Sequence, residues 1–210
     1  MSKEFSENGI DISHWNIVRD FFQVKASGVD FVILKAGGSD KGFYKDRCFE
    51  DYYRMAKLAG LKVGAYYYVG KNFFLYEVGV LDAKRFLNIT HDKDFDYPLV
   101  VDVEEMQPGF KNEVTEATIG FCETLENNGK YAMIYSADIA GYKERLNLDY
   151  LTPYDKWVAR WGKKPTYVKS YGIWQKSSKG IVPGILGNVD LDVSYKDYKA
   201  IMKKTGLNRR

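Results

Sequence analysis

Short apolar runs rich in β-branched residues alternate along the chain with segments whose apolar residues recur at helical spacing. The apolar runs predict strands at 9–13, 30–36, 62–69, 98–104 and 131–136. Between them, amphipathic patterns predict helices at about 17–27, 45–59 and 75–89, and one that carries Val114 to Leu125. Strands that alternate with helices are typical of a parallel sheet with helices packed outside it.

This pattern loosens in the last third of the chain. Further strands are expected at 156–161, 171–175 and 188–193, with short helices at 138–146 and 195–204. Eight strands, with the helices mainly in the first five units, predict an α/β fold: a single irregular (β/α) TIM-like barrel with a looser, strand-rich second half. A doubly wound open sheet is the alternative. Because no repeat, linker or low-complexity segment interrupts the chain, we expect one domain over residues 1–210.

Composition excludes several classes of protein. With 45% apolar and 28% charged residues, the chain is not wholly disordered. Its net charge of +3 comes from basic residues spread along the sequence, so neither nucleic acid nor a membrane is expected as a partner. No run is apolar enough to span a bilayer, and the first residues lack the pattern of a signal peptide. Cys48 and Cys122 are expected to be free, buried thiols.

Acidic residues follow several of the predicted strands. In a parallel barrel the C-terminal strand ends share one rim, which brings together Asp11, Asp102, Glu104 and Asp190. Asp102 and Glu104 are two residues apart, so on a strand their side chains leave the same face, with Cα atoms about 7 Å apart. Neighbouring carboxylates raise each other's proton affinity, so one can stay protonated while the other is ionised. Hydrolysis of a glycosidic bond needs this division between an acid and an ionised carboxylate.

Other readings of these residues remain open. An Asp-x-Glu pair alone is more often a strand end with ordinary ion pairs, and only the convergence of four acids favours catalysis. Four carboxylates could also hold Mg²⁺ or Mn²⁺, as in a divalent-metal hydrolase, although His14 and His91 are too far apart for a zinc pattern. We expect no metal and no cofactor, a rim hydrogen bond for His14, and a tight turn at Gly37-Gly38, which lacks a phosphate-loop pattern.

Several short motifs in a fixed order resemble those of the glycoside hydrolase family 25 lysozymes, the muramidases of bacterial autolysins and phage endolysins. The resemblance extends from Gly9 to the V-D-L-D run that starts at Val189. Each motif is weak alone, and their order and spacing are specific. They are G-I-D-I-S-H-W (9–15), G-A-Y (64–66), D-V-E (102–104), I-Y-S (134–136), A-R-W (159–161) and I-W-Q (173–175).

The resemblance implies an irregular barrel that cleaves the β-1,4 bond between N-acetylmuramic acid and N-acetylglucosamine in bacterial peptidoglycan. By this match Glu104 is the general acid, and Asp102 stabilises the transition state by attacking the sugar or by orienting its acetamido group. Asp11 and Asp190 belong to the same catalytic cleft. The residues expected to bind sugar are Lys35, Tyr66, Tyr68, Tyr135, Trp161, Trp174 and Gln175.

Three positions depart from the family pattern. Ala36-Gly37-Gly38-Ser39 replaces a common Glu-Gly pair, Tyr67 stands where a His is frequent, and Asp192 where an Asn is usual. Since the acids are retained, we expect activity. The alternatives are a chitinase, which commonly has a longer D-x-x-D-x-D-x-E run than the one ending here at Glu104, and a non-catalytic peptidoglycan-binding module.

The expected partner is the glycan strand of peptidoglycan. Without a signal peptide, the protein is expected to stay in the host cytoplasm until lysis and then act on the cell wall, as a phage endolysin does.

Overall fold

Eight strands close into a barrel in the computed structural model, which describes residues 5–105 and 109–209. Hydrogen-bonded neighbours follow the order β1 (Glu7–Ile12), β11 (Val189–Ser194), β9 (Ile173–Gly180), β8 (Asp155–Ala159), β7 (Ala132–Ala137), β6 (Leu99–Asp102), β5 (Lys62–Tyr68) and β3 (Phe31–Gly38). β3 pairs in turn with β1, which closes the ring. The predicted barrel is therefore confirmed, and the alternative of an open sheet is wrong.

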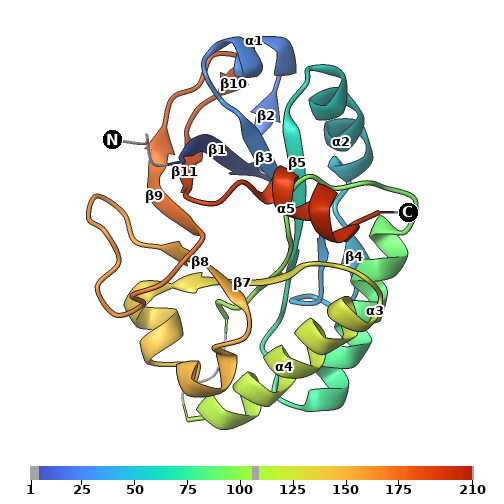
Figure 1. Cartoon of the computed structure of the whole chain (residues 1–210), viewed down its shortest axis with the longest axis vertical. Coiled ribbons are helices and arrows are strands. Elements are labelled where there is room, and N and C mark those ends of the chain that lie inside the picture. Colours follow the sequence, from blue (N-terminus) through green and yellow to red (C-terminus); the bar gives the residue numbers. More distant parts are fainter. Residues whose placement is uncertain (1–4, 106–108, 210) are drawn as a thin grey trace.

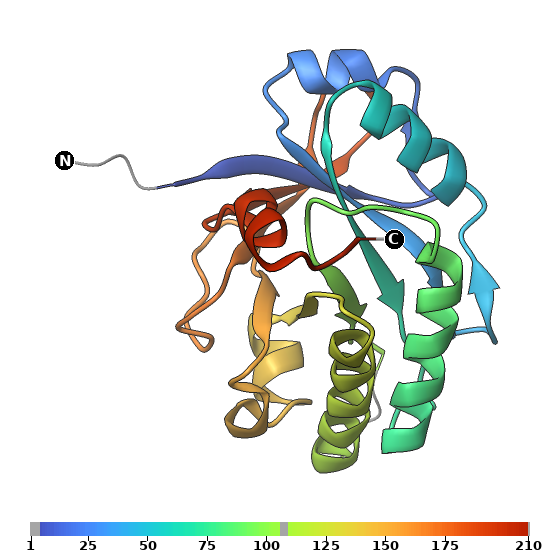
Figure 2. The same cartoon turned by 45° about the vertical axis from the view of Figure 1, so that its right-hand side comes forward.

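Long helices cover only one side of the barrel. The long helices α2 (Phe49–Leu58), α3 (Tyr76–Thr90) and α4 (Lys111–Asn127) all precede β7, as does the short α1 (Phe21–Ala26). Figures 1 and 2 show α2, α3 and α4 along one flank, whereas loops and short helical turns lie beside β8 and β9. The second half carries a π-helix (Asp138–Lys143), a 3₁₀ turn (Leu148–Leu151) and α5 (Tyr198–Thr205). Within the described ranges, no helix is both long and apolar enough to cross a membrane.

The first two helices begin later than the periodicity predicts. Asp20 caps α1 by accepting hydrogen bonds from the backbone N–H groups of Phe22 and Gln23, while the preceding β2 (Ile17–Val18) pairs with β10 (Ile185–Leu186). Apolar spacing alone does not show where such a cap falls.

The second helix starts after a short strand, β4 (Tyr44–Lys45), which pairs with the end of β3. Cys48 is therefore the residue before α2 and is only half-buried, so the prediction of a buried thiol is wrong there. Cys122, on α4, is buried as predicted.

Gly37 and Gly38 form the last two residues of β3, not the tight turn expected from the sequence. A Cβ atom on Gly37 would lie 2.3 Å from the backbone oxygen of Tyr44, and one on Gly38 would lie 2.7 Å from that of Tyr68. Glycine is required here because the neighbouring strands approach too closely for a side chain.

β11 runs antiparallel to both of its neighbours, although the sequence analysis treats all eight strands as parallel. A reversed strand starts at the rim where the parallel strands end. Asp190 lies near the start of β11, directly opposite Asp11 of β1 in the strand register. It therefore reaches the expected rim from the opposite strand direction.

Along the strands, the inward-facing positions change from apolar to polar towards the C-terminal rim. Side chains buried together inside the barrel include Ile33, Val100, Met133, Trp157 and Ile173. Because side chains alternate across a strand, the next inward position is two residues further on. From β3, β6, β7 and β9 respectively these positions are Lys35, Asp102, Tyr135 and Gln175. Apolar side chains therefore fill the interior of the barrel, and polar side chains lie above them at the C-terminal rim.

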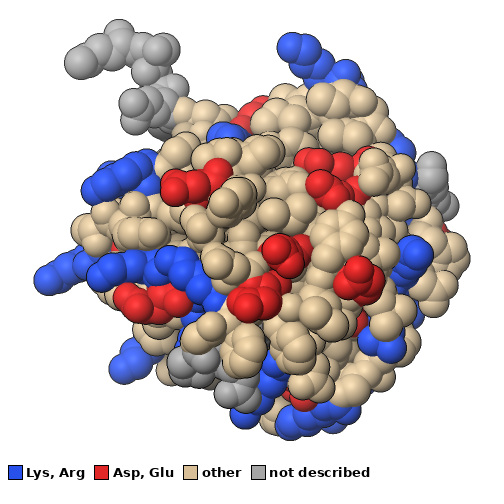
Figure 3. Space-filling view, turned by 90° about the horizontal axis from the view of Figure 1, so that it is seen from below, with Lys and Arg blue, Asp and Glu red and all other residues tan. Residues whose placement is uncertain are grey.

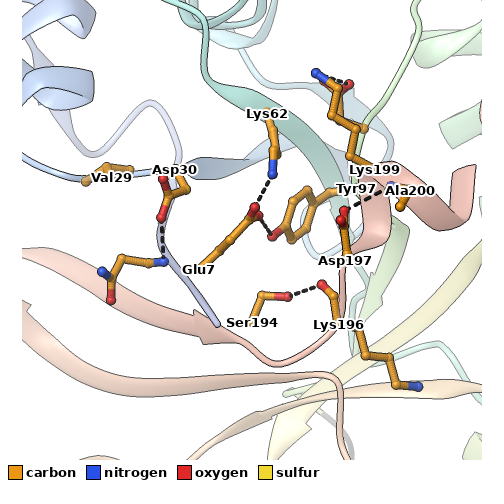
Figure 4. A network of polar contacts seen from close by, with 12 residues as sticks. Glu7, Val29, Asp30, Lys62, Tyr97, Ser194, Lys196, Asp197, Lys199 and Ala200 are labelled. Atoms are coloured by element: carbon orange, nitrogen blue, oxygen red, sulfur yellow. Dashed lines mark hydrogen bonds and ion pairs between the residues drawn. The ribbon is translucent and has the colours of Figure 1, made fainter. Parts of the chain in front are cut away.

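Ion pairs and hydrogen bonds satisfy the acids at the other end of the barrel, where α5 lies against the interior through Tyr198. Glu7, on β1, pairs with Lys62 of β5 and accepts a hydrogen bond of 2.6 Å from the hydroxyl of Tyr97 (Figure 4). Asp155, at the start of β8, accepts hydrogen bonds of 2.8 Å from both Lys196 and Tyr198.

Candidate active site

A cavity of about 510 Å³ opens at the C-terminal rim of the barrel. Figure 3 shows this face, with acidic side chains gathered near its middle and Lys and Arg towards its edges. The residues that line the cavity are Asp11, Ser13, Trp15, Lys35, Asp40, Lys41, Tyr66, Tyr68, Asp102, Glu104, Glu105, Tyr135, Trp157, Trp161, Gln175, Ser178 and Asp190. Its size is that of a site for a small ligand or a few sugar rings.

All but one of the predicted site residues lie in this lining. The exception is Trp174. Because side chains alternate across a strand, Trp174 points away from the cavity, whereas its neighbour Gln175 points into it. The indole N–H of Trp174 instead donates a hydrogen bond of 2.8 Å to the backbone oxygen of Arg160. Trp174 therefore supports the loop after β8, and the structure does not bring it to the cavity.

Asp102 and Glu104 form the first acidic group of the cavity. Asp102 is the last residue of β6, and Glu104 lies two residues beyond it, although the sequence predicts a strand through residue 104. Asp102 is only 5% exposed, and its Oδ1 has no hydrogen-bond partner among the described residues.

Burial raises the pKa of Asp102 well above its usual range, and the charge of Glu104 adds to this. Burial also raises the pKa of Glu104, while the Tyr135 hydroxyl and, more weakly, the Lys35 ammonium act in the opposite direction. Two acids this close titrate as a unit. The pair therefore holds a proton at a pH where a free carboxyl group has lost it.

Asp11, Asp190 and Asp192 form the second acidic group. Asp192 is fully buried; its Oδ1 accepts a 2.8 Å hydrogen bond from the indole N–H of Trp157, and its Oδ2 has no donor among the described residues. Burial raises the pKa of Asp192 to about 8, and burial together with the other two carboxylates raises that of Asp11. In the sequence Asp192 stands out only as a departure from the family pattern, yet its spacing of two from Asp190 places both on one strand face.

Gln175 connects the second group to the aromatic wall. Its Nε2 donates a hydrogen bond of 2.8 Å to Oδ2 of Asp11. Its Oε1 accepts from the Tyr135 hydroxyl at 3.0 Å and from the Trp161 indole N–H at 3.1 Å. Because Gln175 is only 2% exposed, this chain fixes the orientation of the Asp11 carboxylate.

Exposed aromatic rings and one buried cation complete the cavity. Trp15 is 77% exposed and Trp161 is 61% exposed, an unusual state for indole rings that line a cavity. Trp15 is missing from the predicted set, although it closes the first motif, G-I-D-I-S-H-W. The ammonium of Lys35 lies 4.3 Å from the centre of the Tyr68 ring.

The buried carboxylate of Asp138, which the sequence analysis does not single out, fixes the loop that follows Trp161. It accepts hydrogen bonds from the backbone N–H groups of Thr166 and Val168 and pairs with Arg160 at 2.9 Å. Burial acts to raise the pKa of Asp138, but these donors outweigh it and leave the pKa below its usual value. This acid is thus structural.

The two histidines lie outside the acidic groups. Nδ1 of His14 is 2.6 Å from Oδ2 of the buried Asp46, the kind of rim contact predicted for it. His91 is exposed and contacts the backbone oxygen of Asn88. Within residues 5–105 and 109–209, no three His, Cys, Asp or Glu side chains are arranged to hold a metal ion.

Comparison with known proteins identifies similar chains. The model of Glycosyl hydrolases family 25 matches residues 10–185. An autolytic lysozyme of Clostridium acetobutylicum is 34% identical over 185 residues, which are 88% of this chain and 54% of the lysozyme. The chain thus spans about half the length of that relative.

Solved structures agree in fold. The CTP1L endolysin superposes with a TM-score of 0.81 at 26% identity, over 94% of this chain and 70% of that one. A family 25 glycosyl hydrolase from Bacillus anthracis superposes with a TM-score of 0.78 at 22% identity, over 100% and 96%. At 22% identity, the second match shows a shared fold and nothing more.

Proposed function

The chain belongs to glycosyl hydrolases family 25, and from this premise we propose that it hydrolyses the β-1,4 bond between N-acetylmuramic acid and N-acetylglucosamine in peptidoglycan. The observation that carries the proposal is the buried pair Asp102 and Glu104 in a cavity walled by aromatic rings. Similarity to an autolytic lysozyme and to an endolysin supports the choice of substrate.

Within the pair, accessibility assigns the roles. Glu104 is partly exposed, whereas Asp102 is 5% exposed beneath it, so Glu104 is the group that can reach the glycosidic oxygen. The raised pKa of Glu104 keeps a proton available for the leaving sugar at a higher pH than an ordinary carboxyl group does. When the proton that the pair shares lies on Glu104, Asp102 is left ionised and stabilises the positive charge that develops at the anomeric carbon.

The remaining residues bind and orient the glycan. Trp15 and Trp161 offer flat apolar faces to the C–H groups of sugar rings, and Tyr66 and Tyr68 add hydroxyl groups. Asp11, held by Gln175, accepts hydrogen bonds from sugar hydroxyl or acetamido groups.

A non-catalytic peptidoglycan-binding module would need the aromatic rings but not the acids. Maintaining several buried carboxylates that form no direct ion pair with any described residue disfavours folding, so their presence favours an enzyme. A chitinase would use similar groups, and the products of the reaction separate the two enzymes.

We place the action of the protein at the bacterial cell wall, because its proposed substrate is found there. Retention in the host cytoplasm until lysis stays a prediction.

The test is hydrolysis of purified Gram-positive peptidoglycan, followed by borohydride reduction and mass spectrometry of the fragments. Fragments that end in reduced N-acetylmuramic acid are expected. Fragments that end in reduced N-acetylglucosamine would move the cleavage to the other glycosidic bond. Binding to the wall without release of reducing ends would favour the binding module and contradict the proposal.

A further inference from the structure

A second cavity, also of about 510 Å³, lies beside the first. Both cavities include Asp40 and Lys41 in their linings, so they adjoin at these residues. The second is formed by segments that follow β3 and β5 and by the start of α3. Its residues are Ser39, Asp40, Lys41, Gly42, Phe43, Gly70, Lys71, Asn72, Phe73, Val78, Asp82 and Arg85.

Basic side chains that have hydrogen-bond donors left for a ligand line this second cavity. Lys41 and Lys71 are exposed, and neither forms an ion pair with any described residue. Arg85 lies over the ring of Phe43 at 5.3 Å and contacts Asp82 through only one guanidinium nitrogen, at 3.0 Å. Its other N–H groups are thus left for a ligand.

The two acids of this cavity have different surroundings. Asp82 is 1% exposed and is already engaged by the hydroxyl of Ser39 at 2.7 Å and by Arg85, so it fixes the guanidinium and does not face a ligand as a free charge. Asp40 has one buried oxygen, Oδ1, without a donor among the described residues. Because this oxygen is buried, it is not presented to a ligand, and the cavity offers three cationic groups for binding.

The distance from the acid pair matches the structure of the proposed substrate. In the sheet register Asp102 is opposite Tyr68, and Tyr68 is opposite Gly38, so two strand spacings of about 5 Å separate the acid from the edge of the second cavity. N-acetylmuramic acid carries a lactyl group and then a peptide whose second residue is D-glutamate. A lactyl group with two residues spans about 10 Å when extended.

We propose that the second cavity binds the acidic stem peptide of the N-acetylmuramic acid next to the scissile bond. Lys71 and Arg85 bind its carboxylates. This inference rests on the proposed function, since it takes muramyl glycan as the substrate, and it adds that the enzyme recognises the peptide as well as the sugar.

The test compares two substrates: intact glycan strands and strands whose stem peptides an amidase has removed. For each protein, the ratio of kcat/KM on intact strands to kcat/KM on stripped strands is measured. Lys71→Glu is expected to lower this ratio about tenfold, because it replaces an attraction by a repulsion. Arg85→Ala should act in the same direction. Lys84→Ala, an exposed cation one residue away that does not line the cavity, is the matched control and should leave the ratio unchanged.

Each result decides the matter. A ratio that stays constant in Lys71→Glu, or an equal loss on both substrates, overturns the inference. If the wild-type protein hydrolyses neither substrate, the proposed function fails, and binding of a fluorescent N-acetylmuramyl-L-alanyl-D-glutamyl-L-lysine then decides. Binding that Lys71→Glu abolishes and Lys84→Ala preserves supports the cavity as a peptide site, and absence of binding to the wild type overturns it.

Discussion

Glu7 and Asp102 lie at opposite ends of the barrel, in surroundings of opposite kinds. Glu7 has an ion pair with Lys62 and a hydrogen bond from the hydroxyl of Tyr97 (Figure 4). Asp102 has a buried oxygen with no hydrogen-bond partner among the described residues, and its nearest charged neighbours include another acid, Glu104.

The pKa values show what this difference does. At the Glu7 end, Asp96 is also buried, which acts to raise its pKa, but Lys57 outweighs the effect and leaves the pKa below its usual value. At the other end, burial and like charges together raise the pKa of Asp102. Paired acids stabilise the fold, whereas acids held without partners can take up and release protons at the cost of stability.

The largest expected effect comes from removing the proton donor. Glu104→Gln keeps the size and polarity of the side chain but cannot donate a proton to a leaving sugar. We expect kcat on peptidoglycan to fall by about 10²–10⁴-fold, with the melting temperature unchanged or raised. Release of reducing ends measures the rate, and calorimetry measures the stability.

Glu105→Gln is the matched control, because Glu105 lines the same cavity one residue away. It should retain most of the activity. If Glu104→Gln were as active as the wild type, or if the control were equally damaged, the assignment of the acid would be wrong.

At the end of the barrel that holds Glu7, replacing a polar side chain should lower the stability of the fold and leave catalysis unchanged. Lys62→Met leaves Glu7 partly buried without its cation, and we expect a loss of about 1–3 kcal/mol in the free energy of unfolding. Urea denaturation measures this loss. Tyr97→Phe removes one hydrogen bond to Glu7 and should cost about 1 kcal/mol. A fall in kcat/KM at temperatures where both variants are folded would contradict the division between the two ends.

Asp192 should make the free energy of unfolding depend on pH. Its pKa rises from 3.8 to about 8 on folding, so the native state holds a proton that the unfolded chain releases. The stabilisation that this proton represents is complete below pH 3.8 and is lost as pH rises towards 8. Asp192→Asn removes this dependence, since an amide stays neutral and keeps an oxygen for the indole N–H of Trp157.

We therefore expect Asp192→Asn to melt several degrees above the wild type at alkaline pH, because about 1 kcal/mol shifts the melting temperature by about 2–4 °C in a chain of this length. Near pH 4 the two proteins should differ little. Calorimetry across this range is the measurement, and a difference that is the same at both extremes would show that Asp192 is not protonated in the native state.

Much of this arrangement could be predicted because it follows from periodicity. The apolar runs located the strands, and the inward alternation carried Asp11, Lys35 and Gln175 to one rim. Acids that end separate strands meet in any closed barrel, so the acidic cavity did not depend on details of packing.

The errors arise where local patterns do not determine pairing. The direction of β11 depends on its pairing with β9 and with β1, and β1 lies at the other end of the sequence. The cap at Asp20 and the close approach at Gly37 likewise depend on contacts between segments. The ion pair between Glu7 and Lys62 could not be predicted either, because the two residues are 55 positions apart and nothing in either local sequence marks their contact.

The smallest predicted effect distinguishes two tryptophans that are both expected from the sequence to bind sugar. Trp161 lines the cavity and is 61% exposed, whereas Trp174 faces away and donates to the backbone oxygen of Arg160. Trp161→Ala removes a stacking surface, so kcat/KM on glycan strands should fall by about two- to tenfold. Trp174→Phe keeps a ring outside the cavity and should change kcat/KM by less than that, with a small loss of stability from the missing hydrogen bond. Equal losses of activity in both variants would mean that the loop joining them, and not contact with sugar, controls binding at this edge of the cavity.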